Sequence, residues 1–136
     1  MKQLSAATIF LLLLSSSTHG NKLDNNTQKV EFHYIMWACA CANWATLDDI
    51  NKCQDTGKLS DHCVFLEPAD KSLTFSDTFS YSGDIVQFTG RYYIENGFSK
   101  DYIKTEEPVE KAKVFRYTAF KIIKSNYREF INDKDK

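Results

Sequence analysis

Alternation of apolar and polar side chains is the strongest pattern in this chain, and a period of two residues is typical of β-strands. Val30, Phe32, Tyr34 and Met36 occupy every second position, and both faces of the segment become apolar toward Trp37. A strand that is apolar on both faces is covered on both sides. The pattern therefore predicts a central strand that runs into a buried region.

The longest strand pattern follows Asp84. One face of this predicted strand is mainly apolar and consists of Val86, Phe88, Gly90, Tyr92 and Ile94. The other face is mixed and consists of Gln87, Thr89, Arg91 and Tyr93. A glycine in mid-strand is typical of a bulge or sharp bend that lets a sheet curl into a barrel, so Gly90 predicts curvature. Asn96-Gly97 predicts a hairpin turn, because both residues tolerate positive φ, and we expect a returning strand over 98–103.

Thr46 predicts the start of a short helix, because its side chain can cap the first turn and acidic residues at 48 and 49 suit the helix dipole. Three further elements are expected: a buried strand over 63–66, a short helix over 105–112 and a last strand over 113–124. Five to six strands with one or two short helices predict a mainly β fold, a small curved antiparallel β-barrel that is OB-like. A two-sheet sandwich or a lipocalin-like barrel is the alternative.

The chain divides into four parts. Residues 1–20 form the pattern of an export signal peptide, with Lys2 before an apolar run of about ten residues that is too short to span a bilayer. Residues 21–28 are a polar, flexible lead-in, 29–125 a single β-barrel domain and 126–136 a charged C-terminal tail. We therefore expect a secreted or periplasmic protein without stable membrane insertion.

Charge and composition narrow the function. Lys and Arg number 17 against 18 Asp and Glu, so the chain lacks the basic field that attracts nucleic acid. The three histidines accompany no nucleophile pattern, and the five glycines stand singly rather than in a phosphate-binding loop. We expect a protein that is not an enzyme and that needs no cofactor.

Cysteine is the next constraint, because all four cysteines follow the signal pattern: Cys39, Cys41, Cys53 and Cys63. An even number in an oxidising compartment predicts two disulfides, with three possible connectivities. A bridge from Cys39 to Cys41 would close a very small ring, so we expect each of them to pair with Cys53 or Cys63. Such a bridge would stabilise the domain by about 3 kcal/mol.

A metal site is the alternative use of these cysteines. Its ligands would be Cys39, Cys41, Cys63 and His62, which suit zinc or copper. The spacing matches structural zinc sites poorly, because those usually contain pairs separated by two to four residues.

The stretch Trp37-Ala-Cys-Ala-Cys-Ala-Asn-Trp44 concentrates aromatic and sulfur chemistry within eight residues. Aromatic faces beside polar groups are typical of ligand sites, so the candidate binding residues are Trp37, Trp44, Arg91 and Tyr93. We predict an exported, disulfide-stabilised β-domain that acts as a non-enzymatic binding or interaction module. Its partner would be a small molecule, a glycan or a protein.

Overall fold

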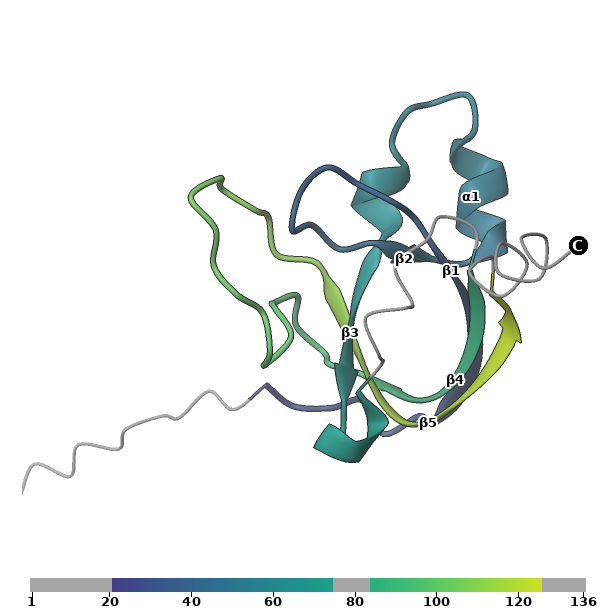
Figure 1. Cartoon of the computed structure of the whole chain (residues 1–136), viewed down its shortest axis with the longest axis vertical. Coiled ribbons are helices and arrows are strands. Elements are labelled where there is room, and N and C mark those ends of the chain that lie inside the picture. Colours follow the sequence, from purple (N-terminus) through teal and green to yellow (C-terminus); the bar gives the residue numbers. More distant parts are fainter. Residues whose placement is uncertain (1–20, 75–83, 126–136) are drawn as a thin grey trace, which may run out of the picture.

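A computed structural model describes residues 21–74 and 84–125 of the 136-residue chain. Within these ranges five strands close into a barrel in the order β1-β2-β3-β5-β4, and β4 pairs back onto β1 (Figure 1). The strands are β1 Gln28–Tyr34, β2 Trp44–Ala45, β3 Val64–Pro68, β4 Ile85–Tyr92 and β5 Lys113–Lys124. The helices are α1 Leu47–Cys53 and two short 3-10 helices, η1 Leu59–His62 and η2 Lys71–Leu73.

The expected class, a small mainly β barrel with one short α-helix, is confirmed, and a closed five-stranded barrel fits an OB-like size. The pairing, however, is mixed rather than wholly antiparallel. β3 and β5 run parallel, from Val64 opposite Lys113 to Pro68 opposite Tyr117, while the other four pairs are antiparallel. The alternation of side chains does not distinguish these directions, because a residue points to the same face in either kind of pair.

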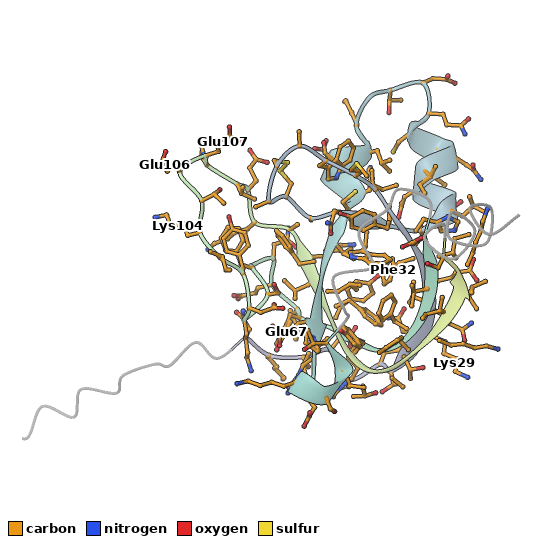
Figure 2. All side chains as sticks on the ribbon, viewed as in Figure 1. Lys29, Phe32, Glu67, Lys104, Glu106 and Glu107 are labelled. Atoms are coloured by element: carbon orange, nitrogen blue, oxygen red, sulfur yellow. A yellow bond between two sulfur atoms is a disulfide. The ribbon has the colours of Figure 1, made fainter. Side chains whose placement is uncertain are left out.

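The inside of the barrel is filled by one cluster of large side chains. Its buried members are Phe32, Trp44, Val64, Val86, Phe88, Phe115 and Tyr117. Phe32, labelled in Figure 2, points into the centre of the ring of strands and meets the Phe115 ring edge-on at 5.5 Å. Interior-facing side chains fill a barrel of this size, so this interior is a packed core.

A second cluster lies on the outer face of the barrel around β3. Its buried residues are Ala42, Ala45, Cys63, Phe65, Tyr93 and Val114. Two irregular segments cover it, the loop 35–43 between β1 and β2 and the excursion 94–112 between β4 and β5, which lie beside each other in Figure 1. The chain therefore builds a second apolar layer from irregular backbone rather than from another sheet.

The excursion 94–112 corrects three expectations. Asn96-Gly97 does not form a hairpin turn, residues 98–103 do not return as a strand, and 105–112 form no helix. Gly97 instead exchanges backbone hydrogen bonds with Ala112 at 2.8 and 3.1 Å, which closes the base of the excursion. Phe98 and Tyr102 then cover Phe65, so burial of these rings outweighs the local turn preference.

The start of the described chain runs along the end of β4. Asp24 N donates to Tyr92 O at 2.8 Å, and Ile94 N donates to Lys22 O at 2.9 Å. These bonds hold part of the expected lead-in 21–28 against the barrel, and β1 begins at Gln28. The signal peptide 1–20 and the tail 126–136 lie outside the described residues. No helix within 21–74 and 84–125 has the length and apolar character needed to cross a membrane.

Gly90 marks the bend that its position in the sequence predicted. The β4–β5 register shifts between Thr89 and Gly90, and Gly90 lies opposite Tyr117. A Cβ added at Gly90 would lie 2.1 Å from the carbonyl oxygen of Arg116 and 2.7 Å from the Tyr117 Cα. The two backbones therefore approach to a distance that only glycine permits.

Gly90→Ala is therefore expected to lower the free energy of unfolding by about 1–3 kcal/mol or more, because the β5 backbone must move to admit the methyl group. Urea unfolding followed by circular dichroism measures the change. Gly97→Ala is the matched control, because a Cβ added at Gly97 would meet no atom closer than the Asn21 Nδ2 at 3.5 Å, which is an ordinary contact. Equal losses in the two variants would contradict the importance of the contact at Gly90.

Candidate binding site at the disulfide loop

The loop 35–43 contains the one disulfide of the described residues, and it joins Cys39 to Cys41. This corrects the expected pairing, because Cys53 and Cys63 are buried thiols. The expectation excluded this pair because the ring is very small, but the backbone bends over 38–41 and brings the two Cα atoms to 5.2 Å. That separation lies within the usual range for a disulfide.

The two tryptophans at the ends of this loop point to different layers. Trp37 packs against the outer cluster, and its Nε1 donates to Ala42 O at 3.0 Å, which ties the loop back on itself. Trp44 is buried inside the barrel, edge-on to Tyr34 at 5.2 Å and to Phe88 at 5.7 Å. The loop is thus anchored by one ring outside the barrel and one inside.

A cavity of about 350 Å³, which we call the aromatic groove, lies between the disulfide loop and the excursion 94–112. Its aromatic lining includes Trp44, Phe65 and Tyr102, and Asn43, Ser99 and Asp101 add polar groups. Volumes of 300–1,000 Å³ with apolar walls and a few polar groups are typical of small-molecule sites. The groove lies where the two clusters meet, because Trp44 and Tyr117 belong to the inner cluster and Phe65 and Tyr102 to the outer one.

Tyr102 is held by two aromatic neighbours and by a backbone hydrogen bond, since its N–H donates to Ser99 O at 3.0 Å. Its ring stacks on Phe98 at 4.4 Å with an interplanar angle of 20°, and it meets Phe65 edge-on at 5.8 Å. Phe65 is itself 7% exposed and belongs to the outer cluster. The position of Tyr102 is therefore fixed before any ligand arrives, which lowers the ordering cost of binding.

A second cavity of about 510 Å³, with more charged residues in its lining, lies on the other side of Cys41, toward α1. The expected cap is confirmed there, because Thr46 Oγ1 accepts from Asp49 N at 3.2 Å and donates to Asp49 Oδ2 at 2.7 Å. The other Asp49 oxygen lies 3.6 Å from His62 Nδ1. Acidic and basic side chains are mixed around this cavity, so its charge favours no single class of ligand.

The alternative metal set is not assembled. The sulfur atoms of Cys39 and Cys41 bind each other, and His62 points toward Asp49. Among residues 21–74 and 84–125 no group of three or more His, Cys, Asp or Glu side chains is placed to hold a metal ion. Burial raises the pKa of the Cys63 thiol to about 11, which disfavours the thiolate that a metal would bind.

Arg91 and Tyr93 lie on the outer face of the barrel, apart from the groove that Trp44 lines. Tyr93 is 7% exposed, and its hydroxyl donates to Glu67 Oε1 at 2.6 Å. Burial is the main cause that raises the pKa of Tyr93 to about 12, and the Glu67 carboxylate adds to it. Tyr93 is therefore a member of a buried polar network rather than an exposed ligand-binding face.

Sequence reasoning missed Tyr102, Glu67 and Arg116. Tyr102 carried no signal beyond being aromatic, because the expected strand over 98–103 hid its role. Glu67 did carry one, since a carboxylate at the end of a buried strand needs a partner when it is desolvated. In the structure Glu67 is 2% exposed and accepts from Tyr93 and from the Lys100 backbone N–H at 3.0 Å.

Comparisons of the chain with protein-family models, with curated protein sequences and with solved structures found no match. The functional proposal therefore rests on the geometry of the two cavities and the outer face.

The cysteine pairing can be checked by alkylation and mass spectrometry. We expect unfolding without reduction to expose two alkylation sites, Cys53 and Cys63, and reduction to add Cys39 and Cys41. In the folded protein Cys63 should react slowly, because a pKa of about 11 leaves about one thiolate in a thousand at pH 8. A peptide that links Cys53 or Cys63 to the loop would contradict this pairing.

The Tyr93 network predicts a loss of stability in alkali. The folded protein favours the neutral phenol, because its pKa is about 12 against about 10 in the unfolded chain. Stability is therefore present below pH 10 and is lost as the pH rises toward 12. The titration is measured by the ultraviolet absorbance of tyrosinate as a function of pH. The difference between the wild type and Tyr93→Phe gives the contribution of Tyr93. In Glu67→Gln the Tyr93 pKa should fall but stay above 10, whereas an unchanged value would show that the carboxylate is unimportant.

Proposed function

We propose that this chain is an exported β-barrel that acts as a non-enzymatic binding module, and that the aromatic groove holds its ligand. The observation that carries the proposal is the packing of Tyr102 on Phe65 and Phe98 in a groove that the Cys39–Cys41 loop also lines. A rigid ring beside polar groups offers both contact area and orientation.

The outside of the barrel is the better location for a ligand. Lipocalin-like proteins hold a ligand inside the barrel, but here the interior is packed with aromatic side chains such as Phe32 and Phe88. The aromatic groove, at about 350 Å³, has room for a small molecule or for the terminal ring of a larger one. Asn43, Ser99 and Asp101 can hydrogen-bond to hydroxyl groups at its edge, which favours a sugar ring or a similar hydroxylated ligand.

Export is supported by the first 20 residues and by the disulfide. The apolar run after Lys2 has the length of a signal peptide rather than of a membrane span. Disulfides persist mainly in oxidising compartments, and Cys39 is exposed, so a reducing cytoplasm would open this bond. Both observations favour a secreted or periplasmic location.

Tryptophan fluorescence can test the groove, because Trp44 forms part of its lining. The probes are a panel of monosaccharides and disaccharides, added to the oxidised protein. We expect at least one sugar to give a saturable change, and Tyr102→Ala to weaken its binding about tenfold or more, as for a central aromatic contact.

Ile103→Ala is the matched control, since Ile103 adjoins Tyr102 but is 81% exposed and does not line the groove. The affinity of Ile103→Ala for the sugar should equal that of the wild type. The absence of any saturable change across the panel would exclude sugars as the ligand class. Equal weakening in the two variants would place the binding site outside the aromatic groove.

A further inference from the structure

Two arginines stand directly opposite each other on the outer face of the barrel. Arg91 of β4 pairs with Arg116 of β5, one position past the bulge at Gly90. Their flanking residues Tyr92 and Phe115 pack inside the barrel, with ring centroids 4.9 Å apart, so both guanidinium groups are carried outward. Like charges at directly opposed positions repel, and such a pair needs compensation.

Arg116 obtains a part of that compensation from Glu67. The Arg116 Nε lies 3.8 Å from Glu67 Oε1, which is near enough for attraction but too long for a hydrogen bond. Both carboxylate oxygens already accept other bonds, Oε1 from Tyr93 and Oε2 from the Lys100 N–H. Arg116 Nη2 donates a long bond of 3.4 Å to Ala69 O.

Arg91 has no carboxylate of its own among the residues that the structure describes. Its recorded bond is from Nη1 to the backbone oxygen of Asp24 at 3.4 Å, and a carbonyl carries no net charge. Among the described residues, Glu67 pairs with Arg116, and no recorded ion pair meets the positive charge of Arg91. The bonds recorded from the two guanidinium groups to backbone oxygens are both long, at 3.4 Å.

Both arginines line a cavity of about 250 Å³ that we call the arginine cleft. Thr27 and Thr118 add hydroxyl groups to its wall, and no acidic residue is among its described lining. It is separate from the aromatic groove, so ligand binding here is independent of the function proposed above. Glu67, labelled in Figure 2, lies on β3.

We propose that the arginine cleft binds a singly charged oxyanion group, either a carboxylate or a sulfate ester. Guanidinium groups bind such oxygens through paired N–H donors, and the planar fork sets the orientation. One negative charge neutralises the charge that Glu67 leaves uncompensated. The cleft is small, which suits a single anionic group that is free or attached to a larger ligand.

Nuclear magnetic resonance titration tests the cleft with sodium acetate, sodium methyl sulfate and sodium phosphate, each against sodium chloride at equal ionic strength. We expect saturable shifts of the Arg91 and Arg116 side-chain N–H signals with acetate or methyl sulfate. Tighter binding of acetate would identify a carboxylate as the ligand group, and tighter binding of methyl sulfate would identify a sulfate ester. Shifts that chloride reproduces, or saturation with phosphate alone, would overturn the proposal.

Arg91→Gln should weaken binding about tenfold, and Arg91→Lys should recover only a part of it, because lysine keeps the charge without the fork. Lys121→Gln is the matched control, since it removes one exposed positive charge from β5 outside the cleft. Equal weakening by Arg91→Gln and Lys121→Gln would show an unspecific effect of net charge and would overturn the proposal.

Thermal unfolding separates a lost site from a lost fold. In chloride, Arg91→Gln should melt no lower than the wild type, because the substitution removes a repulsive pair. In methyl sulfate or acetate, the wild type should gain more in melting temperature than Arg91→Gln, because a ligand stabilises the state that binds it. Equal gains in the two proteins would contradict binding at Arg91.

Discussion

The close approach of β4 and β5 at Gly90 is the contact on which the rest of the barrel depends. The Gly90 backbone lies against Arg116 and Tyr117, and the register shift beside it bends β4 so that the five strands can close. The same contact sets the pairing of the next residues along the two strands. Inside the barrel it brings Tyr92 against Phe115, and outside it places Arg91 opposite Arg116. One steric requirement thus positions a core pair and a charged pair on opposite faces.

Closure also determines where a ligand can bind. The described interior of this five-stranded barrel is filled largely by aromatic side chains, and the cavities lie where irregular segments pack against the barrel. The disulfide loop and the excursion 94–112 provide such segments, and both pack on the outer cluster around Phe65. Their rings are therefore held by burial rather than by regular hydrogen bonding, which gives a rigid groove on irregular backbone (Figure 1).

The sequence predicted those features that depend on neighbouring residues alone. Strand alternation, the bend at Gly90 and the Thr46 cap are local, and each is present. The pairing of Cys39 with Cys41 depends on a bend that no local pattern marked, and the Asn96-Gly97 turn yielded to the burial of distant rings. The candidate binding residues divide in the same way. Arg91 was among the candidates from the sequence, but its cross-strand neighbour Arg116 depends on a strand register that sequence alternation does not fix.

The outer face of β3 connects the two candidate sites. Phe65 and Glu67 are two positions apart and therefore point to the same side, Phe65 toward Tyr102 of the aromatic groove and Glu67 toward Arg116 of the arginine cleft. Glu67 also accepts from the Lys100 backbone, so the excursion that carries Tyr102 is held by an apolar contact and by a buried carboxylate. Since unpaired buried charge is costly, Glu67 keeps its partners, and in our proposal an anion from solution meets the charge of Arg91.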